Sequence, residues 1–221
     1  MMGFISYLVN GISLGSVYAI IALGYTMVYG IAKMLNFAHG DVIMIGGFVT
    51  FTAVSGMGLP PVLGVLISVV VCTALGMLIE RIAYKPLRGA SKLAVLITAI
   101  GVSYFLQNVA LLIYGSNTKS FTSVVSIEPL SLADGAIIIS GETMVTILAC
   151  IVIMVALTSF IKYSKSGRAM LAVSEDSGAA QLMGVNVNAT IALTFAIGSA
   201  LAAIAGVLLC SSYPALTPYT G

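Results

Sequence analysis

The sequence NFAHGD, residues 36–41, holds the only histidine of the chain and a carboxylate two residues after it. Four explanations fit these residue types: a proton relay, a metal site, a contact with a solute, or a break between two helices, with Asn36 as N-cap of the second. The spacing disfavours a metal, because no further ligand stands nearby in the sequence. The chain also carries no motif of a nucleophile with its base and no phosphate-binding loop, so we do not expect an enzyme.

The composition shows which environment surrounds this motif. Hydrophobic residues make up 60% of the 221 residues, charged residues make up 7%, and the mean hydropathy is +1.14. A soluble domain carries roughly 25% charged residues, because water must solvate its surface. The outer surface of this chain must therefore face lipid, and we predict an all-α, polytopic membrane protein.

The charged residues are clustered and leave long segments free of Asp, Glu, Lys and Arg. A membrane-spanning helix needs about 20 apolar residues. The longest uncharged internal segment, 42–79, is split at SGMGLPP (residues 55–61), where glycine and proline interrupt helices. We predict one transmembrane domain over 1–221 with six spans, at about 5–32, 37–56, 61–80, 93–114, 143–162 and 189–210.

Basic residues predict the orientation, because they favour cytoplasmic loops. They gather in 80–92 and at the start of 162–188, whereas 115–142 has a single lysine among acidic residues. This assignment places the N-terminus outside and makes 33–41 a cytoplasmic-side turn. Every charge then lies at a span end or in a loop, which disfavours an ion-driven secondary transporter. The loop 115–142 could touch a receptor protein or be a passive connector.

The cytoplasmic loop 162–188 is long enough to form two short helices. We expect Ser174 to be an N-cap, with Glu175 and Asp176 in the first turn, where the helix dipole favours acids. Gly184 suits the C′ position, which takes left-handed geometry. Such an amphipathic segment can lie on the membrane surface or insert into a partner, and both alternatives stay open here.

Two long motifs resemble a known family. GRAMLAVSEDSGAAQLMGVNVNATIALTFAIGSALAAIAGVLL and NGISLGSVYAIIALGYTMVYGIAKMLNFAHGDVIMIGGF are similar to the LivH-type permeases of branched-chain amino-acid ABC transporters. The resemblance implies the type II ABC importer fold, in a bacterial or archaeal inner membrane, and import of leucine, isoleucine and valine. It also implies a homologous second permease, two cytoplasmic ATPase subunits that hydrolyse ATP, and an external solute-binding protein. No cofactor and no nucleic acid is implied.

The resemblance also suggests which residues contact the ATPase. They lie in the loop 162–188 and are Gly167, Arg168, Glu175, Asp176, Ala179, Ala180 and Gly184. One departure is Leu171, where the family often has a basic residue. The family continues beyond the sixth span, so we expect a C-terminally shortened member, for which a scaffold role is an alternative.

A translocation path or gate is expected around the opening motif. The candidates are Tyr25, Asn36, Phe37, His39, Gly40 and Asp41. Tyr25 and Tyr29 share a helix face, which also fits an interfacial aromatic belt. A helix break with capping and packing, and an inner gate beside the path, both remain open. Urea, short amides and other amino acids are alternative solutes.

Overall fold

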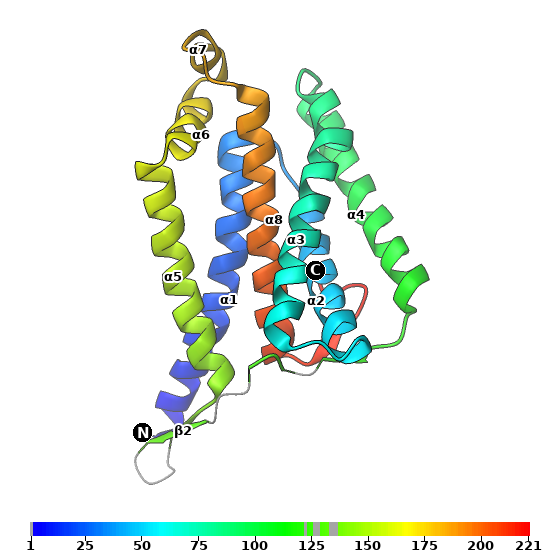
Figure 1. Cartoon of the computed structure of the whole chain (residues 1–221), viewed down its shortest axis with the longest axis vertical. Helices are drawn as coiled ribbons and strands as arrows, with labels where there is room; N and C mark the ends of the chain where they lie inside the picture. The colour runs from blue at the N-terminus through cyan, green and yellow to red at the C-terminus, as the bar shows by residue number, and fades with distance from the viewer. Residues whose placement is uncertain (1, 122, 126–128, 133–136) are drawn as a thin grey trace.

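Six long helices, among the residues that the structure describes, run side by side in this computed structural model (Figure 1). The described residues are 2–121, 123–125, 129–132 and 137–221. The long helices are α1 (Met2–Ala32), α2 (Ala38–Phe51), α3 (Pro61–Ile79), α4 (Lys92–Tyr114), α5 (Gly141–Tyr163) and α8 (Val187–Ser212). Each belongs to a helical segment long and apolar enough to cross a membrane, which confirms the predicted all-α polytopic fold.

Short helical turns extend two of these helices. The π-helix η1 (Thr52–Gly56) continues α2, whereas the π-helix η2 (Glu80–Tyr84) and the 3₁₀ turn η3 (Lys85–Leu87) continue α3. The break between η1 and α3 falls within SGMGLPP, where Pro61 occupies the first turn of α3. Proline suits this position because its missing N–H would have no helical partner.

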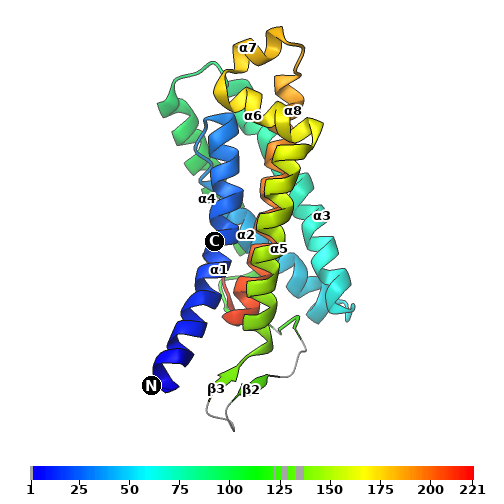
Figure 2. The ribbon, with the colours of Figure 1, turned by 90° about the vertical axis from the view of Figure 1, so that its left-hand side faces the viewer.

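The remaining elements lie at the two ends of the bundle. The helices α6 (Lys165–Glu175) and α7 (Ser177–Leu182) form a hairpin at one end, and the N-terminus lies at the other (Figures 1 and 2). Two antiparallel pairs join β1 (Lys119–Ser120) to β4 (Ala215–Leu216) and β2 (Leu130–Leu132) to β3 (Ile137–Ile139). Glu128 and Asp134, which we used to place the loop 115–142, lie outside the described residues.

Helix α8 is the centre of the bundle. Its most apolar stretch is 72% buried, against 11% for α5, and it packs against α1, α2 and α3. Small residues allow this close approach: a Cβ at Gly206 would overlap the carbonyl of Ile43 in α2. A Cβ at Gly76 in α3 would likewise overlap Ser199 of α8. Close backbone packing of this kind is how helices associate in lipid.

Candidate functional site

Asn36, His39 and Asp41 of the motif NFAHGD are buried inside the bundle, whereas Phe37 is 47% exposed. A Cβ on Gly24 would meet His39 Cε1 at 2.9 Å and the Gly198 carbonyl at 3.2 Å, and both glycines lie far from the ends of their helices. Gly40 contacts Gly221, and that terminus lies at mid-height in both views (Figures 1 and 2). The motif thus enters the bundle and does not lie in a turn at its end, whereas Lys33 and Met34 line a hollow at the hairpin end. That this end faces the cytoplasm stays a prediction. The distribution of charges predicts on which side of the membrane a connection lies. It does not predict how far the chain re-enters the bundle before the next helix begins.

The segment between α1 and α2, residues 33–37, is called the buried break below after Asn36, its one buried side chain; Lys33, Leu35 and Phe37 are exposed. Helix α1 ends where Lys33 adopts φ 55°, a left-handed conformation that is uncommon for residues other than glycine. Helix α2 begins at Ala38, four residues after Met34. Phe37 occupies the N-cap position, and no side chain accepts a hydrogen bond from the first turn there. The predicted N-cap role of Asn36 is therefore wrong, because the Asn36 side chain has another partner.

That partner is Tyr84 in η2, whose hydroxyl donates to Asn36 Oδ1 at 3.0 Å. The carbonyl of Asn36 accepts the backbone N–H of His39 at 3.2 Å, which closes the turn into α2. Asn36 is 4% exposed. A buried amide of this kind must find a partner, and here the partner comes from a different helix.

Asp41 is also buried inside the bundle, at 3% exposure. Its Oδ1 accepts the side-chain amide of Gln107 in α4 at 2.9 Å, and Gln107 also lies 3.3 Å from the Ser103 hydroxyl. Asp41 lies in the first turn of α2, so it stands at the end of a span, although its carboxylate is buried against α4. The inference against an ion-driven secondary transporter therefore stays a prediction.

The other predicted gate residues converge on one groove. The groove has a volume of about 480 Å³. The lining includes Tyr18, Tyr25, Asn36, Phe37, His39 and Gly40. The ring of His39 stands edge-on to Tyr25, with centroids 6.0 Å apart. Asp41 differs from this set because its carboxylate contacts α4. Within the described residues, no group of three or more His, Cys, Asp or Glu side chains is placed to hold a metal ion.

The hairpin, defined as α6 and α7, is fixed by local caps. Ser164 Oγ accepts the N–H of Gly167 at 2.8 Å, and Gly167 packs directly on the backbone of α5 at Phe160 and Ile161. Met170 and Val173, which belong to α6, are also buried. Gly167 therefore acts through packing, since any side chain there would collide with α5.

The cap of the second short helix is Asp176. Its Oδ1 accepts the N–H groups of Gly178 at 2.8 Å and Ala179 at 3.0 Å. Ser174 lies inside α6 and donates to the carbonyl of Leu171, so the prediction that Ser174 is the N-cap is wrong. An ionised carboxylate accepts N–H groups more strongly than a hydroxyl does, which favours the cap two residues later.

The end of α7 has the predicted glycine geometry. Gly184 has φ +84°, and the N–H of Val185 donates to the carbonyl of Ala180 at 3.0 Å. This is the pattern of a C′ glycine in a Schellman motif. Directly before it, the side chains of Leu182 and Met183 are 89% and 85% exposed. Among the other predicted contact residues, Arg168, Glu175, Asp176 and Ala179 are exposed, whereas Gly167 and Ala180 are buried.

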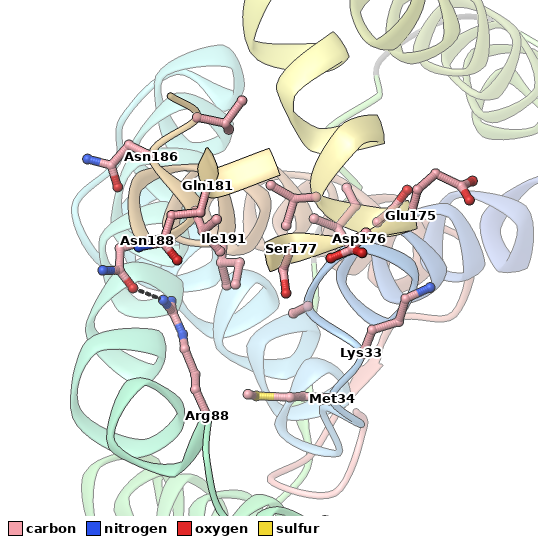
Figure 3. A pocket seen from close by; sticks show the side chains of 16 residues that line it. Lys33, Met34, Arg88, Glu175, Asp176, Ser177, Gln181, Asn186, Asn188 and Ile191 are labelled. Carbon is pink, nitrogen blue, oxygen red and sulfur yellow. Dashed lines mark hydrogen bonds between the residues drawn. The ribbon is translucent and has the colours of Figure 1, made fainter. Parts of the chain in front are cut away.

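A hollow of about 670 Å³ separates the hairpin from the ends of α1 and α3. Figure 3 shows Lys33, Arg88, Asp176, Gln181 and Asn188 around it. Arg88 forms an ion pair with Glu80 and donates to the side chain of Asn188. Our sequence reasoning did not find this cluster. Glu80 and Asn188 are 8 and 100 residues from Arg88 in the sequence, so no helical spacing indicates that they are in contact.

Comparison with known proteins assigns the family. Residues 7–221 match the family described as the permease component of branched-chain amino acid transport systems. The chain belongs to this family. It is therefore a multi-pass membrane protein and a transport component rather than an enzyme, and a component of a system works with other subunits.

Curated relatives agree with this assignment. The chain is 42% identical to the high-affinity branched-chain amino acid transport system permease protein LivH of Escherichia coli K12, and 43% identical to BraD of Pseudomonas aeruginosa. Both matches cover 99% of this chain and 74% of the relative. A probable LivH of Methanocaldococcus jannaschii is 28% identical over 86% of this chain and 61% of its own length. No solved structure matches the chain significantly.

Proposed function

We propose that this chain is a membrane subunit of an ATP-driven importer for leucine, isoleucine and valine. An external binding protein delivers the solute, a homologous second permease completes the membrane part, and two cytoplasmic ATPase subunits supply energy. The N-terminus lies outside and the hairpin lies in the cytoplasm. Family membership supports the solute class, since the names of LivH and BraD state branched-chain amino acids.

The exposed tip of the hairpin carries the assignment of an ATPase contact. Leu182 and Met183 are almost fully exposed at the end of the bundle where most basic residues gather. Apolar side chains presented this way beyond a helical bundle favour a protein partner over water. Arg168, Glu175, Asp176 and Ala179 would meet the ATPase, while Gly167, Ala180 and Gly184 would hold the shape of the hairpin.

The groove beside the buried break is the proposed path or gate. Apolar and aromatic groups dominate its lining, and the polar exceptions are Asn36, His39, Thr220 and the hydroxyls of Tyr18 and Tyr25. Such a lining suits the aliphatic side chain of a branched-chain amino acid, which passes without tight binding. Phe37 and Gly40 lie at the start of α2, where a change in the break would widen or narrow the groove. Asp41 would hold α2 against α4.

Replacing both tip residues tests the ATPase contact. With Leu182→Asp and Met183→Asp, ATPase subunits that co-purify with the membrane chain should fall about ten-fold, as expected for the loss of an interface hot spot. Met57→Asp is the matched control, because Met57 is 71% exposed at the opposite end of the bundle. Undiminished co-purification of the double variant would contradict the docking assignment.

Uptake tests the solute. Vesicles carrying the complete complex should accumulate labelled leucine when ATP and the binding protein are supplied, and excess isoleucine or valine should compete. Urea and acetamide should not compete. Uptake of labelled urea with no uptake of leucine would overturn the solute assignment.

A further inference from the structure

Arg88 connects the hairpin end of the bundle to the π-helix η2. Its Nη1 donates to Oδ1 of Asn188 at the start of α8, and its Nη2 pairs with Oε1 of Glu80 (Figure 3 shows the bond to Asn188). Glu80 is only 3% exposed. A buried carboxylate needs its partner, so the position of Arg88 and the position of η2 depend on each other.

The other end of η2 reaches the buried break. Tyr84 is 1% exposed and packs on Phe195 of α8, with ring centroids 5.2 Å apart. Its hydroxyl donates to Asn36 Oδ1 at 3.0 Å and lies 3.4 Å from the carbonyl of Leu35. Glu80 and Tyr84 belong to the same five-residue turn, so a displacement of one moves the other. Such π-turns are rare, and they occur frequently at functional sites.

A short connection joins the hairpin to Asn188, the residue that accepts the hydrogen bond from Arg88. Only four residues separate the end of α7 from the start of α8, and Asn186 caps α8 by accepting the N–H of Ala189 at 3.1 Å. Asn188 is the second residue of α8, and Asp176 and Gln181 of the hairpin border the same hollow as Arg88. A displacement of the hairpin therefore reaches Asn188 before it reaches the membrane-spanning part of α8.

We propose that Asn188, Arg88, Glu80, Tyr84 and Asn36 form a mechanical link, called the Arg88 link, that sets the geometry of the buried break according to the position of the hairpin. Asn188, Arg88, Glu80 and Tyr84 are positioning residues, since they act through the break and do not need to touch the solute, whereas Asn36 itself lines the groove. The inference rests on the proposed function, because ATPase binding is what moves the hairpin. Glu80, Tyr84 and Asn36 are buried, and dense interior packing transmits movement among them. The bond between Arg88 and Asn188 is exposed, so it connects this buried part to the hairpin end through a hydrogen bond and not through packing.

Tyr84→Phe tests the link, because it removes one hydroxyl and keeps the ring on Phe195. In the complete complex in vesicles, ATPase assembly and basal ATP hydrolysis should stay unchanged, while solute transported per ATP falls about five-fold, the lower range of allosteric coupling. Tyr114→Phe is the matched control: its hydroxyl lies 3.1 Å from that of Thr52, outside the link. The control should keep the wild-type ratio.

Hydrogen exchange at residues 33–41 gives a second readout that needs no solute. Trapping the complete complex with ATP and vanadate should change exchange there in the wild type, and Tyr84→Phe and Asn188→Ala should each reduce that change. The double variant should lose no more than the single variants, because both changes interrupt one link. A wild-type response in Tyr84→Phe, or additive losses in the double variant, would overturn the link.

The two readouts separate the link from the proposed function. Leucine uptake by the wild type together with a wild-type transport ratio in Tyr84→Phe would overturn the link and leave the function standing. A vanadate response at 33–41 that Tyr84→Phe abolishes, with no branched-chain amino acid taken up by the wild type, would support the link and overturn the solute.

Discussion

The buried break and the hairpin both interrupt long apolar helices, yet their polar groups find partners in opposite ways. In the hairpin, Ser164 and Asp176 accept N–H groups two or three residues away. At the break, Asn36 and Asp41 are bonded to side chains 48 and 66 residues away. The polar groups of the hairpin thus need no distant partner, although Gly167 packs on α5, whereas those at the start of α2 depend on η2 and α4.

This difference suits the two proposed roles. A locally capped hairpin can be pushed by a partner without losing its helices. A break held by distant helices changes when those helices move, which is what a gate requires. The Arg88 link would join the two regions. If the contacts indicate this correctly, the break depends on distant helices and the hairpin does not, and the following variants test that difference.

The largest effect is expected where α2 crosses α8. A Cβ at Gly206 would overlap the carbonyl of Ile43, so Gly206→Ala must push apart the two helices that enclose the break. We expect a loss of about 3 kcal/mol in the free energy of unfolding, as for other overpacked cores. Denaturation by SDS in mixed micelles measures it.

Gly101→Ala on α4 is the control for that substitution, because a Cβ there meets nothing within 4 Å. It should leave the unfolding free energy unchanged or slightly raised, since alanine favours helix. Equal stability of the two variants would show that α2 and α8 can separate at no cost, and the break would then not depend on their packing.

A smaller effect is expected at the contact between α2 and α4. Gln107→Leu leaves buried Asp41 without its amide donor, which should cost about 2 kcal/mol of unfolding free energy. The neighbouring Asn108→Leu should cost less, because the Asn108 amide is exposed and bonds the Tyr104 carbonyl of its own helix. Equal free energies of unfolding for the two variants in the same micelle titration would show that the bond from Gln107 to Asp41 does not stabilise the contact between α2 and α4.

The smallest effect on the whole chain is expected in the hairpin. Asp176→Ala removes the cap of α7 and should cost about 1 kcal/mol locally, the usual value of an N-cap. Hydrogen exchange should rise across 177–182 and stay unchanged at 33–41. Ser174→Ala is the control and should alter neither segment, since its hydroxyl only bonds back to Leu171. Increased exchange at the break in Asp176→Ala would remove the distinction between the two regions.

Features that depend on composition or on near neighbours could be predicted from the sequence. The low charge content determined that lipid surrounds the chain, and SGMGLPP determined where the second and third long helices separate. Gly184 marked the end of α7, because a left-handed C′ residue closes contacts only a few residues away. Even the misplaced cap was wrong by only two residues, from Ser174 to Asp176.

The depth of NFAHGD and the partners of its polar groups could not be predicted in this way, because they depend on how distant helices pack. Tyr84, Gln107 and Arg88 reach their partners across 48, 66 and 100 residues. No periodicity in the sequence encodes such distances. They arise because close packing of α2, α3 and α8 at small residues brings η2 and α4 against the start of α2, and a buried polar group then bonds whatever donor the packing has placed beside it.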